Sequence, residues 1–255
     1  MKKFEILGVK ISAINMEDAC DIIRQAITSR KKIYISVCPV STVMECLKDQ
    51  KMLVSVNSAT LATPDGMPVV WLGKMKGHSN IRRVYGPDLM LEACKISAEK
   101  GFKNYFYGSS EQVLEKLQKK LKSVFSGLNI TGLYSPSFSK LSESEDEEII
   151  KMINNSDSDI LWVGLGSPKQ DIWMYEHRDK LSVPVMIGVG AAFDFISGTK
   201  KQAPKLVQKI GMEWLFRLIS EPKRLWKRYF FGNAQFLYLI SKEIIKERCL
   251  KRSNI

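Results

Sequence analysis

A continuous apolar run that ends in a Gly-x-Gly turn is the feature that most constrains how this chain folds. Residues 160–163 read Ile-Leu-Trp-Val, and Gly164-Leu-Gly166 follows directly. Such a run bounded by glycine predicts a buried strand. Pro168 and the acidic Asp171 both suit the first turn of a helix. In α/β proteins a strand, a tight turn and a helix N-terminus present donors to a phosphate or a sugar, although the same turn also serves plain strand-to-helix packing.

The rest of the first 205 residues alternates between helical and strand patterns. This alternation predicts an α/β fold with a parallel sheet covered by helices. We expect residues 1–205 to form the body and residues 206–255 to form a helical C-terminal appendage. The predicted helices are 18–29, 40–51, 86–100, 111–123 and 143–154, and the predicted strands are 32–38, 58–63, 103–108, 128–134, 160–163 and 184–190.

Composition narrows the function classes. The chain has 255 residues, of which 45% are hydrophobic, enough for one sizeable core or two modest ones. No window resembles a signal peptide or a spanning helix, and the five cysteines include no Cys-x-x-Cys pair, so we expect a reduced cytoplasmic location. Only two histidines are present, which argues against a zinc enzyme, and we predict no metal site.

Positive charge is concentrated at the C-terminal end. Fourteen of the basic residues, but only four acidic ones, lie from residue 200 onward. Such asymmetry points to an anionic partner, although a solvated helical face is the alternative. Apolar residues recur at near-helical spacing after Pro222, beside basic ones, which predicts contact with an anionic membrane surface; a core helix that closes the domain is the alternative. These apolar residues are Trp226, Tyr229, Phe230, Phe236, Leu237 and Ile240, and the basic ones are Lys223, Arg224, Lys227 and Arg228.

Three further segments carry residues capable of chemistry. Pro64-Asp65-Gly66 places a carboxylate on a sharp turn, although an Asp there is often only a turn former. The segment 188–194 ends a strand with glycines and supplies Asp194, and Arg82-Arg83 precede a helix that starts near Pro87. Arginine and a helix N-terminus are the usual receptors for a diphosphate. The chain has no Walker sequence and no Gly-x-Gly-x-x-Gly, so neither ATP hydrolysis nor a dinucleotide cofactor is indicated, and we predict no cofactor.

Taken in order, the motifs resemble those of the WecG/TagA/CpsF family of bacterial glycosyltransferases. The resemblance runs from Gly8-Val9 to about Phe236, and six spaced motifs in order are far more specific than any one of them. The motifs are Asp65-Gly66, Arg83-Val84-x-Gly86-x-Asp88, the segment 163–170, Gly188-Val-Gly190 with Phe193-Asp194, Ala203-Pro204, and Glu213-Trp-Leu-x-Arg217 with Glu221-Pro-x-Arg224.

This resemblance implies a Rossmann-like fold and an inverting transfer from a UDP-sugar to a lipid diphosphate-linked saccharide. The donor sugar would be of the N-acetylmannosamine type or a related hexose. Family members build wall teichoic acid linkage units, enterobacterial common antigen and exopolysaccharide, and work without the Asp-x-Asp metal motif. Asp157-Ser-Asp159 has that spacing but precedes a strand, so we interpret it as a turn. The implied location is the inner face of the cell membrane, with peripheral binding.

The resemblance also implies roles for single residues. Asp65 is the candidate general base, which inversion in one step requires. The shorter acid Asp171 stands where many members have Glu. Where many members have Thr-Pro-Asn, this chain has Cys38-Pro-Val-Ser41, so the role of that segment passes to Ser41 or Thr42 or is lost. The predicted donor- or acceptor-binding residues are Ser41, Thr42, Arg83, Gly86, Asp88, Gly164, Gly166, Lys169, Gln170, Asp194, Arg217, Arg224 and Arg228.

Two other functions compete with the enzyme. A nucleic-acid-binding module would use the basic, aromatic tail on phosphates and bases, but would need nothing from Asp65 or Gln170. A non-catalytic sugar-nucleotide sensor on the same fold would differ from the enzyme only in lacking turnover. We favour the enzyme and expect no nucleic-acid partner. The donor sugar, the acceptor, the linkage and the oligomeric state stay open, a homo-oligomer included.

Overall fold

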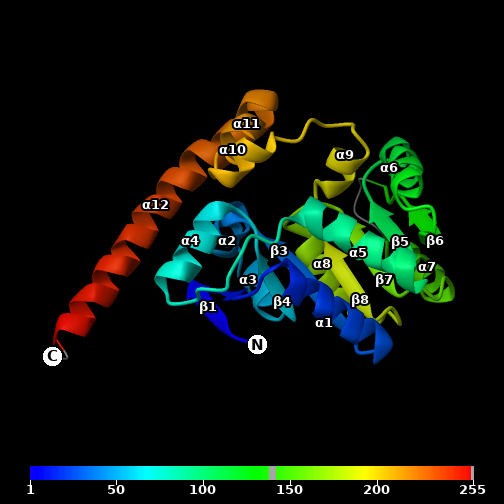
Figure 1. Cartoon of the computed structure of the whole chain (residues 1–255), viewed down its shortest axis with the longest axis horizontal. Coiled ribbons are helices and arrows are strands. Elements are labelled where there is room, and N and C mark those ends of the chain that lie inside the picture. Colours follow the sequence, from blue (N-terminus) through cyan, green and yellow to red (C-terminus); the bar gives the residue numbers. More distant parts are fainter. Residues whose placement is uncertain (138–141, 254–255) are drawn as a thin grey trace.

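A six-stranded parallel sheet forms the centre of the molecule (Figure 1). The computed structural model describes residues 1–137 and 142–253, apart from the side chains of residue 228 and residues 247–253. The strand order is β4-β3-β8-β7-β5-β6, and every neighbouring pair is parallel. This confirms the predicted Rossmann-like α/β fold. The strands are β3 (Ile33–Cys38), β4 (Leu61–Pro64), β5 (Lys103–Gly108), β6 (Asn129–Tyr134), β7 (Ile160–Gly164) and β8 (Val185–Gly188).

Helices cover both faces of this sheet, so its inner strands are buried on both sides. Along β7, Ile160 and Trp162 pack into one cluster with helices α1, α5, α6 and α9, while Leu161 and Val163 pack into another with α7 and α8. This alternation follows from the two-residue period of a strand. The helices of the body are α1 (Met16–Thr28), α2 (Val40–Cys46), α3 (Gln50–Asn57), α4 (Met67–Met75), α5 (Gly86–Lys100), α6 (Glu111–Val124), α7 (Glu143–Asn155), α8 (Lys169–His177) and α9 (Ala192–Ile196).

The structure differs from the expected elements at several places, and the short helix α9 is among those that were not predicted. The single helix predicted over 40–51 is two helices, because Asp49 accepts hydrogen bonds from Lys51 N and Met52 N and so caps a new helix. Helix α4 was not predicted. An antiparallel hairpin of β1 (Lys3–Ile6) and β2 (Val9–Ser12) was also missed, although its residues alternate between exposed and buried.

The C-terminal segment consists of three helices, α10 (Lys205–Lys209), α11 (Glu213–Ser220) and α12 (Pro222–Ser253). In Figure 1 the long α12 runs diagonally along one side of the body, and its C-terminal end extends past it. Helix α12 contacts α2 and α11. Glu243 ties it to the body, since its carboxylate lies 3.0 Å from Lys76 Nζ and accepts a hydrogen bond from Leu7 N.

The apolar stripe predicted for membrane contact divides between two faces of α12. Phe236 and Ile240 are buried in a third core cluster with β1, β2, α2, α3 and α4, and Tyr229 is also buried. Assigning these three residues to a membrane face was therefore wrong, because the body covers Phe236 and Ile240, and Tyr229 lies beside Trp214 of α11. The exposed apolar side chains of α12 are Trp226, Phe230, Phe231, Leu237, Tyr238 and Ile245.

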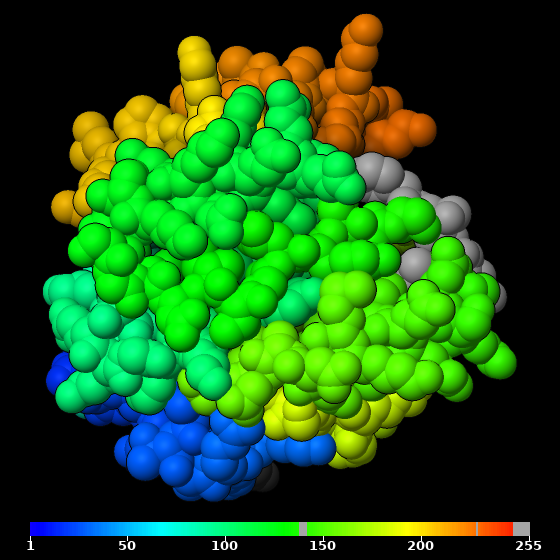
Figure 2. All heavy atoms as spheres, turned by 90° about the vertical axis from the view of Figure 1, so that its right-hand side faces the viewer, coloured from blue at the N-terminus to red at the C-terminus, as the bar shows by residue number. Residues whose placement is uncertain are grey.

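The opposite end of the molecule carries the β6 edge of the sheet. Figure 2 looks onto this end, where α6 and α7 form most of the surface and the C-terminal segment appears only along the upper rim. No helix in the described part of the chain is both long enough and apolar enough to cross a membrane.

Candidate active site

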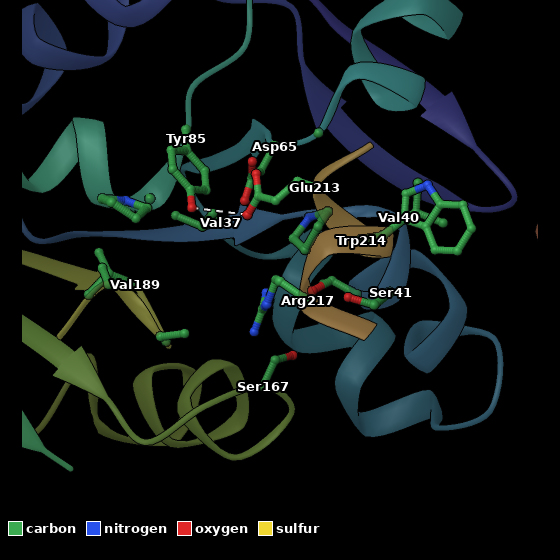
Figure 3. A pocket seen from close by; sticks show the side chains of 18 of the residues that line it. Val37, Val40, Ser41, Asp65, Tyr85, Ser167, Val189, Glu213, Trp214 and Arg217 are labelled. Atoms are coloured by element: carbon green, nitrogen blue, oxygen red, sulfur yellow. Dashed lines mark hydrogen bonds between the residues drawn. The ribbon is translucent and has the colours of Figure 1, made fainter. Parts of the chain in front are cut away.

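A cavity of about 460 Å³ opens at the carboxyl edge of the sheet. Because all six strands are parallel, the loops that follow β3, β4, β7 and β8 meet at this edge and line the cavity. Helices α11 and α12 supply the opposite wall, including Trp214, Arg217, Arg224 and Phe236. Figure 3 shows side chains from both walls turned toward the same space. The site is therefore built jointly by the body and the C-terminal helices.

Asp65 lies directly after β4, on the sharp turn that precedes α4. Gly66 adopts a φ of 85°, which glycine reaches without steric cost, and the next residue begins the helix. The Asp65 side chain is buried, and its Oδ1 lies 3.1 Å from both Nε and Nη2 of Arg83. Burial raises the pKa of Asp65 to about 6, since the Arg83 guanidinium opposes this shift only in part and Glu213 adds to it. A carboxyl group with this pKa can accept a proton near neutral pH.

Arg83 lies between two carboxylates rather than facing open solvent. Its Nη2 is 2.5 Å from Glu213 Oε2, and its guanidinium carbon lies 4.0 Å from the centre of the Tyr85 ring. Tyr85 Oη in turn donates to Glu213 Oε1 at 3.0 Å, the contact dashed in Figure 3. Arg83 lines the cavity, but its guanidinium already has two anionic partners.

The glycine turn after β7 brings α8 under the cavity. Gly164 packs against the ring of Phe193, where a Cβ would lie 2.5 Å from the ring, and Gly166 has a φ of 79°. Gln170 is buried at the floor, where its Oε1 accepts a hydrogen bond from Gly190 N at 2.9 Å. Its amide thus connects the loops after β7 and β8.

Asp171 does not only stabilise the start of α8; it also bonds to the sheet. Its carboxylate is fully buried and accepts a 2.5 Å hydrogen bond from Ser36 Oγ on β3. Burial raises the pKa of Asp171 to about 6, against the opposing effect of its hydrogen bonds. This contact fixes α8 to the sheet below the cavity.

Several polar atoms at the cavity wall are buried and have no partner within the described part of the chain. They include Thr42 Oγ1 and Arg217 Nε, whereas Ser167 Oγ lies near the Asp171 carboxylate. Ser41 and Thr42 begin α2 directly after β3, and both line the cavity. In Figure 3 the guanidinium of Arg217 extends into the space above Ser167. Buried polar groups ordinarily have hydrogen-bonding partners, so this cluster is typical of a place where a polar ligand binds.

Most of the other predicted residues also reach the cavity. Gly86 begins α5 at its rim, and Asp194 lines it at 3.5 Å from Lys200 Nζ. Arg224 lines it from α12, with its Nε donating to Glu221 at 2.7 Å. Asp88 and Lys169 are exposed and are not among the lining residues. The predicted residue Arg228 lies outside the described side chains.

Tyr85 and Gln208 line the cavity but were not predicted, and Glu213, which also lines it, was named only as part of a motif. A signal for Glu213 was present, because it lies four residues before Arg217 and thus shares its helical face. No pattern in the neighbouring sequence indicated a role for Gln208, whose Oε1 lies 3.4 Å from Arg83 Nη1.

The Asp-x-Asp sequence is a turn, as predicted. Asp157 has a φ of 48° and follows α7, and Asp159 accepts hydrogen bonds from Lys103 N and Arg30 Nη1 at the amino ends of β5 and β7. This is the sheet edge opposite the cavity. Within residues 1–137 and 142–253, no group of three or more His, Cys, Asp or Glu side chains is placed to hold a metal ion.

A cavity with arginines in its lining, at the carboxyl edge of a parallel sheet, is the usual place for a ligand site in an α/β protein. The model of the WecG/TagA/CpsF family of glycosyl transferases matches residues 4–250, and the chain therefore belongs to this family of enzymes. This membership favours the enzyme over the nucleic-acid-binding module.

Relatives from two bacterial genera carry the same functional name. The chain is 30% identical over 184 residues to an N-acetylglucosaminyldiphosphoundecaprenol N-acetyl-beta-D-mannosaminyltransferase of Bacillus spizizenii, covering 72% of this chain and 69% of the relative. It is 29% identical over 246 residues to proteins of the same name from Staphylococcus aureus, covering 94% of this chain and 92% of the relative.

Proposed function

We propose that this chain moves an N-acetylmannosamine-type sugar, or a related hexose, from a UDP-sugar to a saccharide carried on a lipid diphosphate, with inversion. The names of its relatives support a transferred N-acetylmannosamine and an acceptor of the N-acetylglucosaminyl diphospholipid class. The observation that carries the proposal is the buried Asp65 carboxylate facing the same cavity as Arg217 and Arg224.

In this mechanism Asp65 takes the proton from the acceptor hydroxyl while the oxygen forms a bond to the anomeric carbon of the donor. The bond from that carbon to the UDP oxygen breaks, and its electron pair leaves with the diphosphate. The raised pKa of Asp65, about 6, suits this role, because it leaves the base ionised at neutral pH yet more basic than an exposed carboxylate.

The departing diphosphate gains negative charge, which donors on the C-terminal wall would neutralise. Arg217 of this wall brings a guanidinium whose Nε has no partner among the described residues, and Thr42 of the opposite, body wall adds a hydroxyl that has none there either. Preorganised donors of this kind stabilise developing charge strongly because they are shielded from water. Protein cations thus take the part that a metal ion plays in other transferases.

We also propose that residues 206–255 form an appendage that binds the inner face of the membrane peripherally. The exposed side chains of Trp226 and Phe230 lie beside Lys223 and Lys227, which are exposed as well. Aromatic and basic side chains together favour the interface of an anionic bilayer. A lipid-linked acceptor would then meet the cavity at the membrane surface.

The test is a transfer assay with the full chain, a panel of UDP-sugars and a short-chain N-acetylglucosaminyl diphospholipid. We expect release of UDP and formation of a disaccharide lipid of inverted anomeric configuration, with UDP-N-acetylmannosamine or a related UDP-hexose preferred. Binding of a UDP-sugar without turnover would instead favour the sensor. Transfer with retained configuration would contradict the single-step mechanism.

A further inference from the structure

Arg83 lies between two carboxylates, those of Glu213 and of the candidate base Asp65. Asp65, Arg83 and Glu213 have side chains only 12%, 16% and 14% exposed, so solvent screens them weakly. Arg83 contacts Asp65 through Nε and Nη2 and contacts Glu213 through Nη2. With both carboxylates ionised, the cluster carries one net negative charge.

Glu213 is held on both of its oxygens. Oε2 contacts Arg83, and Oε1 accepts from Tyr85 Oη. It is the first residue of α11, where the helix dipole stabilises a negative charge. The residue is 130 positions away from Arg83 in the chain, so the contact exists only when the C-terminal helices lie on the body.

We propose that Glu213 is a positioning residue for the base: by holding one edge of the Arg83 guanidinium, it keeps Arg83 from neutralising Asp65 completely, and it does so only while α11 is docked. The inference rests on the proposed role of Asp65 as the base. It adds to that role a carboxylate of the C-terminal helices that acts through Arg83.

The electrostatic reason follows from the groups that face Asp65. Arg83 comes from the segment before α5, Glu213 and Arg217 come from α11, and Cys38 lies at the end of β3. Burial and the negative charge of Glu213 both disfavour ionisation of Asp65, while Arg83 and Arg217 favour it. If Glu213 loses its charge, Arg83 attracts Asp65 alone, and the pKa of Asp65 falls. A carboxylate with a lower pKa is a weaker base.

The decisive variant is Glu213→Gln, which keeps the shape and the hydrogen-bonding oxygen but removes the charge. In the transfer assay we expect the acid limb of kcat/KM to move to lower pH by on the order of one unit. We also expect the plateau rate to fall roughly three- to tenfold, because the base is weaker. A merely structural role would lower the rate without moving the acid limb in this direction.

A second readout does not depend on activity. The carboxyl carbon of Asp65, labelled with ¹³C in the full chain and assigned with Asp65→Asn, should titrate at lower pH in Glu213→Gln than in the wild type. An unchanged or raised titration point would overturn the proposal even if transfer is confirmed. Conversely, if Asp65→Asn retains full transfer activity, the base assignment fails while the effect of Glu213 on the titration is still measured.

Glu243→Gln is the matched control. Glu243 also ties the C-terminal helices to the body, through Lys76 and Leu7 N, but it is not among the residues that line the cavity. We expect this variant to leave the acid limb and the Asp65 titration where they are in the wild type. An equal shift in both variants would show that looser docking, rather than the charge of Glu213, is responsible, and would overturn the proposal.

Discussion

The two walls of the cavity are built in different ways. The body wall consists of loops at strand ends, and its polar groups are largely buried and bonded to one another, as Gln170 is to Gly190 and Asp171 to Ser36. On the C-terminal wall no residue of α11 is fully buried, and Arg217 Nε has no partner in the described part of the chain, although Glu213 is bonded to Arg83 and Tyr85. The body thus holds Asp65, the proposed base, on a buried strand-end turn, while the appendage contributes cations and apolar side chains that are more exposed.

Removing the base tests the body wall and should have the largest effect. We expect Asp65→Asn to lower kcat by about 10²- to 10⁴-fold, because a general base is lost, while the fold and donor binding persist. Steady-state kinetics and binding of the UDP-sugar measure both. The matched control is Asp157→Asn at the opposite sheet edge, which removes the same charge from an exposed site. Near-wild-type turnover of Asp65→Asn would show that the carboxylate on the body wall is not the general base.

The two faces of α12 can be separated by neighbouring residues. Phe236 is 4% exposed and Leu237 is 65% exposed. We expect Phe236→Ala to lower the free energy of unfolding by about 3–5 kcal/mol, because it leaves a cavity in the core. Leu237→Ala should change it by less than about 0.5 kcal/mol, as exposed substitutions do. Urea titration measures the difference. Equal effects would mean that α12 is not held to the body by this face.

The cations of the appendage can be tested without a membrane. We expect Arg217→Ala to lower transfer to a water-soluble acceptor analogue roughly 10²-fold, because a donor to the leaving diphosphate is lost. Arg82→Ala is the control, since this guanidinium bonds Ser79 O and Ile81 O and does not line the cavity. If soluble-acceptor transfer survives without Arg217, the appendage serves only as an anchor.

The membrane face depends on exposed lysines. We expect the double variant Lys223→Gln, Lys227→Gln to weaken binding to anionic vesicles by about 2 kcal/mol, on the order of 1 kcal/mol per residue. The loss should shrink at high salt. Lys119→Gln with Lys120→Gln is the control, because these exposed lysines lie on α6 at the other end of the molecule (Figure 2). A vesicle-sedimentation assay that finds equal losses would place membrane contact elsewhere.

The smallest expected effect is that of metal removal on the transfer rate. Since arginines of the C-terminal wall are positioned to neutralise the leaving group, we expect turnover to survive EDTA within a few-fold. The measurement is the transfer rate in chelator with and without added magnesium. Loss of turnover that magnesium restores would assign the neutralisation to a metal ion instead.

Local patterns in the sequence already determined much of the architecture. The helix 86–100 and the strand 103–108 were predicted with the bounds that the structure has, because apolar periodicity and flanking glycines are local properties. The same holds for the strand-end loops: once the sheet is parallel, Asp65, Gly164 and Gly190 must meet at one edge.

Only the tertiary structure decided which distant residues pack against or pair with one another. A helical stripe does not reveal what covers it, so Phe236 and Ile240 could be placed against the body only by the packing of α12 on α2. Likewise, the sequence shows that Arg83 is basic, but its pairing with Glu213 requires α11 to lie against the segment before α5, across 130 positions. The physical reason is that periodicity reports how a segment folds, whereas charge pairing and burial depend on which distant segments the fold brings into contact.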